Sequence, residues 1–118
     1  MTTRTETELA TAVLREMGVV DAEETPATVD ITWVTSCYED KFAELQSPGL
    51  ELTYWLKTNI PQAVFNLLRD LIINEVQGSY GDPLPPDVKE QREILILKKL
   101  RRHVSVPSAG VPTMAEYF

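Results

Sequence analysis

Cysteine and histidine are scarce in this sequence, and each occurs only once. A single cysteine, Cys37, cannot form an internal disulfide or build a cysteine-based zinc cluster, and His103 is the only histidine that could serve a catalytic triad. Cys37 lies in a helical pattern beside Trp33, so we expect it to be a small buried hydrophobic residue. His103 ends a basic helix, where the helix dipole favours a cation. We therefore expect no metal site and no cofactor.

Long apolar segments are also missing. No apolar run approaches the roughly 20 residues that span a bilayer, and the polar residues 1–8 lack the apolar core of a signal peptide. Apolar residues make up 43% of the 118 residues and charged residues 25%, which is typical of a folded globular chain. We expect a protein without a membrane partner, located in the cytosol or in a particle assembled there.

Positive charge is scarce over most of the chain. Residues 1–87 contain 15 acidic and 5 basic side chains, whereas residues 88–118 contain 3 acidic and 6 basic ones. The net charge of −7 therefore combines −10 in the first segment with +3 in the second. An acidic body argues against a dedicated nucleic-acid-binding protein, which usually presents a basic face. The opposite signs favour head-to-tail or ring association of copies.

Caps and apolar periodicity predict four helices, near residues 6–17, 27–46, 61–77 and 87–103, with negligible strand. The fold class is therefore expected to be all-α. The first helix has the clearest boundaries. Thr5 and Glu8 have the spacing of a capping box, and Gly18 supplies a stop at the other end.

The second and third helices are expected to begin at prolines. Thr25 can cap the second helix while Pro26 takes its first position, and Pro61 has the same place in the third. Residues 50–56 are too short and irregular for a helix and are expected to be extended or a single turn. The third helix is apolar over more than half of its circumference, which implies burial between neighbours. The predicted core of one protomer is Leu9, Val13, Val34, Tyr38, Phe42, Val64, Leu68, Leu71, Ile72, Ile94 and Leu97.

The chain is expected to divide into a helical domain, residues 1–103, and an extended C-terminal arm, residues 104–118. Pro107, Gly110 and Pro112 oppose a helix in the arm, yet it carries apolar groups that a free tail has no reason to display. A basic cluster precedes the arm at the end of the fourth helix. We expect cluster and arm to bind a partner through Lys98, Lys99, Arg101, Arg102, Val106, Pro107, Val111, Pro112, Met114, Tyr117 and Phe118.

Catalytic residues are not evident. Glu6, Glu8 and Glu16 share one helix that we expect to be exposed, and none is flanked by an apolar pocket that would raise a carboxyl pKa for acid catalysis. The serines have no histidine partner other than His103. We therefore expect a protein that is not an enzyme.

Three stretches resemble the head-to-tail adaptor proteins of short-tailed phages, which are also called tail accessory or head-completion proteins. They are ELATAVLREMG at residues 8–18, IPQAVFNLLRDL at residues 60–71 with Tyr80-Gly81 after it, and KKLRR at residues 98–102 before the proline-punctuated arm. Together with the helix order, the resemblance spans nearly the whole chain.

The resemblance implies a helical protomer that forms a ring of about twelve copies under the portal protein. Such a ring extends the DNA channel, through which DNA passes without sequence-specific binding, and offers a platform for the downstream tail or nozzle protein. Its location would be the head–tail junction of the virion, after assembly in the host cytoplasm. The arm would lie on the portal or on a neighbouring adaptor subunit.

A small helical DNA-binding or regulatory protein is the alternative. Four helices with the basic cluster at residues 98–102 could resemble a small repressor, which would form a stable dimer and bind DNA in a salt-sensitive way.

Overall fold

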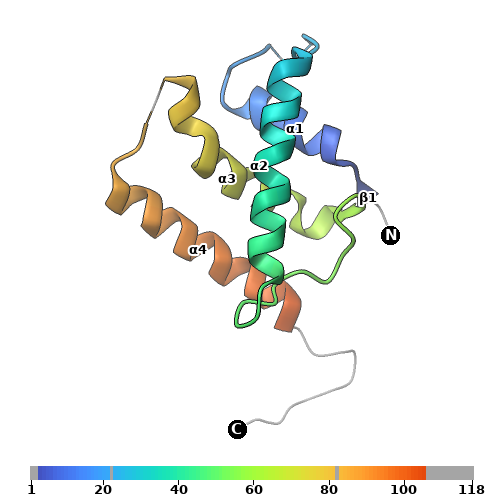
Figure 1. Ribbon diagram of the computed structural model, residues 1–118, viewed down its shortest axis with the longest axis vertical. Coiled ribbons are helices and arrows are strands. Elements are labelled where there is room, and N and C mark those ends of the chain that lie inside the picture. The colour runs from blue at the N-terminus through green and yellow to red at the C-terminus, as the bar shows by residue number, and fades with distance from the viewer. Residues whose placement is uncertain (1–2, 22, 82, 106–118) are drawn as a thin grey trace, which may run out of the picture.

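The fold is described by a computed structural model for residues 3–21, 23–81 and 83–105, and helices dominate these residues (Figure 1). The elements in chain order are β1 (Thr3–Arg4), α1 (Glu6–Glu16), α2 (Thr28–Gln46), β2 (Ile60–Pro61), α3 (Gln62–Val76), the 3-10 helix η1 (Gln77–Tyr80) and α4 (Pro86–Ser105). The all-α prediction is confirmed. Strand structure in the described part of the chain is confined to β1 and β2, which pair antiparallel with Thr3 opposite Pro61.

Helix α1 begins and ends where its sequence signals place it. The Thr5 hydroxyl accepts a hydrogen bond from the Glu8 backbone N–H at 3.1 Å, and the Glu8 carboxylate accepts one from the Thr5 N–H at 2.8 Å. This reciprocal pair is the predicted capping box. At the other end Gly18 follows the C-cap residue Met17 with φ +78°, a left-handed conformation that glycine adopts without steric cost.

Helix α2 starts later than predicted. The Ile31 N–H bonds to the Ala27 carbonyl, so Ala27 is the N-cap and the helix begins at Thr28. Thr25 and Pro26 lie before the helix, and their predicted capping roles are wrong. The Ala27 side chain cannot accept a hydrogen bond, but Asp30 places a negative charge in the first turn, where the helix dipole favours it.

Helix α3 is the centre of the core and packs against α1, α2 and α4. In Figure 1 it runs between α1 and α4. Its buried side chains include Leu68 and Leu71, both fully buried, which explains why its apolar surface covers more than one face. Pro61 is the N-cap residue of this helix, one position before the first helical position predicted for it.

The segment between α2 and α3 is not helical, as predicted, and it closes one end of the core. Leu52 and Trp55 are buried, and the Trp55 indole N–H donates a hydrogen bond to the Tyr38 hydroxyl at 3.3 Å. That hydroxyl donates in turn to the Lys57 carbonyl at 2.9 Å. The Phe42 ring packs against both the Tyr38 and Trp55 rings at 5.9 Å between centroids. A side-chain network thus holds the loop.

Most of the predicted core is confirmed, with two exceptions on α4. Nine of the eleven residues are buried: Leu9, Val13, Val34, Tyr38, Phe42, Val64, Leu68, Leu71 and Ile72. Leu97 is only partly buried, and Ile94 is 56% exposed, so its placement in the core is wrong. The reason is that α4 packs on one side against α3, where Leu100 is fully buried, whereas Ile94 points to a different side of the helix.

Candidate functional site

Helix α4 lies at the edge of the helical body, and its inner face is fixed by polar contacts as well as by Leu100. The Asn74 amide on α3 donates a hydrogen bond to the Lys89 carbonyl at 3.0 Å. Asn74 is only 4% exposed, so this bond is protected from competition with water. The first turns of α4 are therefore held in place on α3.

A buried ion cluster makes a second attachment. Lys41 on α2 is 7% exposed, and its ammonium Nζ lies 2.9 Å from Glu44 Oε1, 2.9 Å from Glu75 Oε1 and 3.1 Å from Glu93 Oε2. Burial alone lowers the pKa of a lysine, but hydrogen bonds to the three glutamates outweigh it and raise the pKa of Lys41. Because the glutamates come from α2, α3 and α4, the cluster ties three helices together at one point.

The outer face of α4 combines apolar and basic side chains. Ile94 and Leu95 are each 56% exposed, and Lys98, Lys99 and Arg102 are exposed within the next two turns. Arg101 is also exposed but engages another group of the protein. Adjacent exposed apolar side chains rimmed by polar residues, with arginine among them, are features of surfaces that bind a protein partner.

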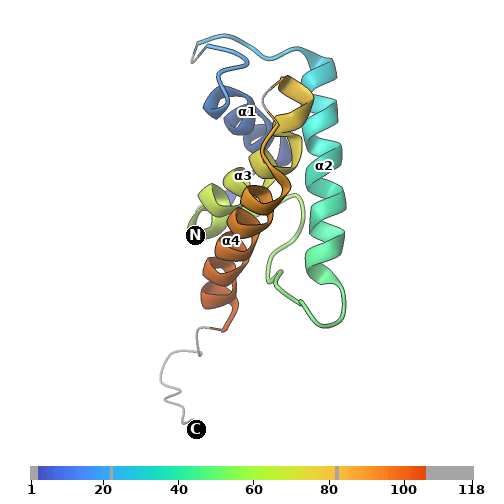
Figure 2. The same cartoon turned by 90° about the vertical axis from the view of Figure 1, so that its left-hand side faces the viewer.

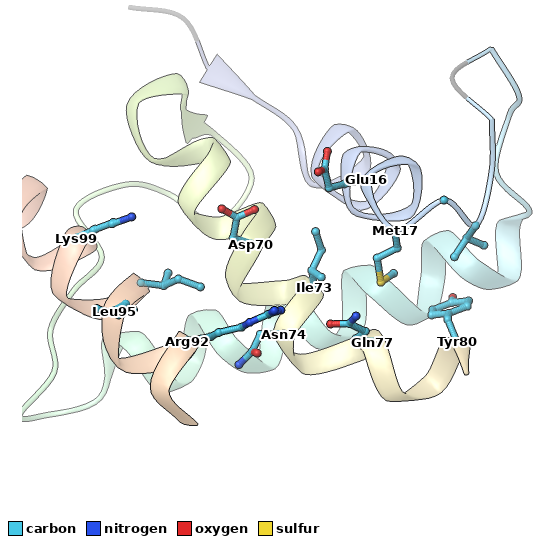
Figure 3. Close-up of a pocket in the computed structure, with 13 residues that line it drawn as sticks. Glu16, Met17, Asp70, Ile73, Asn74, Gln77, Tyr80, Arg92, Leu95 and Lys99 are labelled. Carbon is cyan, nitrogen blue, oxygen red and sulfur yellow. The ribbon is translucent and has the colours of Figure 1, made fainter. Parts of the chain in front are cut away.

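A groove flanks this face. It has a volume of about 860 Å³ and runs across α3, between the end of α1 on one side and α4 on the other (Figure 3). Met17 and Ile73 give it an apolar interior, while its α4 wall is formed by Arg92, Leu95, Ile96 and Lys99. In Figure 3 the Arg92 side chain reaches from α4 toward α3. The buried Oδ1 of Asn74, which also lines the groove, has no hydrogen-bond partner among the described residues.

The predicted partner-binding residues divide into two groups. Lys98, Lys99, Arg101 and Arg102 lie on exposed turns of α4 next to His103, as expected for a basic helix end. Helix α4 continues to Ser105, two residues beyond its predicted end, so Val104 and Ser105 belong to the helix and not to an extended arm. The arm positions lie outside the described residues: Val106, Pro107, Val111, Pro112, Met114, Tyr117 and Phe118.

Sequence reasoning missed Leu95 and Arg92 as surface groups. The run Ile94-Leu95-Ile96-Leu97 contained the signal, because four consecutive residues occupy all sides of a helix and cannot all face one neighbour. In the structure Ile96 and Leu97 are partly buried, whereas Ile94 and Leu95 are exposed and Leu95 lines the groove. Glu16 and Met17, at the end of α1, also line the groove, but they are distant from α4 in sequence, so no local pattern predicts their place in it.

One carboxyl group differs from expectation. Glu6 is partly buried, and burial together with the neighbouring Glu39 carboxylate raises its pKa, although Lys57 acts in the opposite direction. The expectation that Glu6 is exposed is therefore wrong. Lys57 forms an ion pair with Glu39 at 3.3 Å. Neither Glu6 nor Glu39 lines the groove beside α4.

The lone cysteine is partly buried, and this burial raises the pKa of the Cys37 thiol, which keeps it in the less reactive neutral form. Within residues 3–21, 23–81 and 83–105 no group of three or more histidine, cysteine, aspartate or glutamate side chains is arranged to hold a metal ion. None of the helices in these ranges is long and apolar enough to cross a membrane.

Comparison with known proteins gives no relative. No family model matches the chain, and neither a curated protein nor a solved structure matches it significantly.

Proposed function

We propose that this protein is a phage head-to-tail adaptor, or connector, that binds under the portal protein as a ring. The ring extends the DNA channel and offers a platform for the downstream tail or nozzle protein. The observation that carries the proposal is the outer face of α4, where Ile94 and Leu95 stand exposed beside Lys98 and Arg102. This face belongs to a helix that is rigidly attached to the body and leads directly into the C-terminal arm.

Rigid attachment matters because a docking surface that is already ordered loses little entropy when it binds. The Lys41 cluster and the Asn74 bond to Lys89 fix α4 before any partner arrives. The arm, residues 106–118, then adds its own apolar side chains to the contact. Aromatic residues near its end, Tyr117 and Phe118, are the side chains best suited to anchor it in a pocket of the portal.

Charge supports the same assignment. Residues 1–87 have a net charge of −10 and residues 88–118 one of +3, so the basic end of one subunit is attracted to acidic surface on the portal or on the next adaptor subunit. Such attraction speeds encounter and weakens with added salt.

DNA passes through the channel of this assembly without sequence-specific contacts, and the proposal gives the chain no catalytic role, no cofactor and no membrane contact. Its place is the head–tail junction of the virion, reached by assembly in the host cytoplasm.

The proposal is tested by co-sedimentation of the full chain with the portal protein of the same phage. The wild-type protein should pellet with portal rings, and Leu95→Glu should weaken this binding by at least about tenfold, the loss expected from a central apolar contact. Leu56→Glu is the matched control, because Leu56 is 70% exposed but belongs to the loop before α3 and not to α4. Equal binding by wild type and Leu95→Glu would contradict the role given to α4.

A DNA-binding or regulatory function is the second candidate, and the exposed basic residues Lys98, Lys99 and Arg102 favour it. This reading predicts duplex DNA binding whose affinity falls steeply with salt, because each phosphate contact releases counterions. The adaptor reading predicts portal binding and weak, non-specific DNA binding. Titrating the protein with duplex DNA at several salt concentrations, with and without portal protein, separates the two.

A further inference from the structure

Two exposed helix faces of the protomer are complementary to each other. The large hydrophobic side chains that the described residues leave exposed come in three pairs: Val29 and Trp33 on α2, Ile94 and Leu95 on α4, and Tyr54 and Leu56 in the loop before α3. Each of the α2 and α4 pairs is followed along its helix by exposed charge, which is acidic on α2 at Asp40 and basic on α4 at Lys98 and Arg102.

On α2 the exposed residues Val29, Trp33, Ser36 and Asp40 recur at spacings of four, three and four, which places them in one line along the helix. We name this line the α2 outer stripe. Val29 is 78% exposed and Trp33 45%, so its first half is apolar, and it ends in the acidic Asp40. Asp40 has no ion-pair partner among the described residues.

On α4 the exposed residues Gln91, Leu95, Lys98 and Arg102 recur at the same spacings of four, three and four. We name this line the α4 outer stripe. Leu95, with Ile94 beside it, gives it an apolar first half, and Lys98 and Arg102 make its second half basic. The distance along the helix from Leu95 to Arg102 equals that from Trp33 to Asp40, about 10 Å for seven residues.

We infer that the α4 outer stripe of one copy packs in parallel against the α2 outer stripe of a second copy. In this register Leu95 meets Trp33 while Arg102 meets Asp40, so the apolar and charged halves match simultaneously. The inference deepens the proposed function and rests on it for the place of the assembly under the portal. The pairwise contact itself rests on the two stripes.

The α2 and α4 outer stripes of one protomer do not pack against each other, because both are exposed in it. In Figure 2 α2 runs along the right edge of the molecule while α4 faces the viewer, so one copy can offer both stripes to two different neighbours. Both helices run downward in that view, but Figure 1 shows α4 inclined to α2, so parallel packing of the two stripes turns each copy relative to the next. A contact between two different surfaces repeats from copy to copy and generates a ring when the rotation closes.

The inference is tested by sedimentation velocity of two full-length variants, Trp33→Glu and Leu95→Glu, alone and mixed. Both side chains are exposed, so circular dichroism should show unchanged folding. Wild type should self-associate as its concentration rises, and each variant alone should lose this by at least about tenfold in affinity. The mixture should form a one-to-one dimer and nothing larger, because each variant keeps the stripe that the other lacks. Leu56→Glu should associate like wild type.

A charge exchange provides an independent readout. Asp40→Arg and Arg102→Asp should each weaken self-association, and the double variant should restore it, because the pair is re-formed with its signs reversed. Wild-type protein that stays monomeric up to its solubility limit, or a Trp33→Glu variant that self-associates while Leu95→Glu does not, would overturn the inference. If the self-association results contradict the predictions above but the protein still binds the portal, only this inference is refuted. If the variants change self-association as predicted but the protein does not bind the portal, only the proposed function is refuted.

Discussion

Replacing Lys41 with methionine tests how α4 is held on the body. The substitution keeps a long side chain but removes the one cation that contacts Glu44, Glu75 and Glu93. Glu44 is 53% exposed at its side chain and can turn to water, whereas Glu75 and Glu93 are 29% and 27% exposed and would be left as poorly solvated neighbouring anions. We expect a loss of about 3 kcal/mol, the lower end of the range for breaking a buried pair.

The loss is measured by urea denaturation at neutral pH and by thermal melting. About 3 kcal/mol corresponds to a fall in melting temperature of roughly 10 °C or more for a domain of this size. Lys57→Met is the matched control, because its ion pair with Glu39 is 41% and 44% exposed at the two side chains and should contribute less than about 1 kcal/mol. A Lys41→Met protein no less stable than Lys57→Met would refute the view that this cluster fixes α4.

Three further predictions concern the core, the pH response and the arm. Leu68→Ala should cost about 2–5 kcal/mol, because Leu68 is fully buried, and unchanged melting would be incompatible with its central place. Burial raises the pKa of Tyr38 to about 12 from its ordinary value of 10.0, so its contribution to stability is complete below pH 10 and is lost as the pH rises through about 12. Spectrophotometric titration should show two late-ionising tyrosines, because burial also raises the pKa of Tyr80 to about 12, and Tyr38→Phe should remove one of the two; an unchanged titration curve would contradict this. Deleting residues 106–118 should leave helix content and melting almost unchanged but abolish assembly on the portal, and truncated protein that still forms portal-bound rings would disprove the role of the arm.

Local signals predicted the helices well because the residues that set them are close in sequence. The capping box of Thr5 and Glu8 and the stripe Val34, Tyr38, Phe42 each depend on contacts within a few residues. The start of α2 was misplaced because several neighbouring residues can accept the first helical hydrogen bond, and propensity alone does not choose among them.

Features made by distant residues were not predictable. Strands β1 and β2 pair Thr3 with Pro61, which lies far from it in the sequence. The ion pairs of the buried Lys41 likewise involve Glu75 and Glu93, which follow it by more than 30 residues. The orientation of Ile94 was missed for a related reason. A run of four apolar residues shows that α4 has apolar surface on several sides, but only its contact with α3 decides which side is covered.

The candidate site shows the same division. The sequence predicted that the basic cluster lies at the exposed end of the last helix, because charge at a helix terminus is a local property. The groove beside α4 is lined by residues from the end of α1 and from α3, which are distant in sequence. No local sequence pattern predicts that these segments lie side by side. The match between the α2 and α4 outer stripes became visible only once Trp33 and Leu95 were known to face outward.

Electron microscopy of portal rings incubated with the full-length protein tests the central claim most directly. The adaptor account predicts an additional ring of helical density at one end of the portal, with the symmetry of the portal and an open channel along its axis. Portal rings that stay bare at low salt in the presence of folded protein would contradict the account.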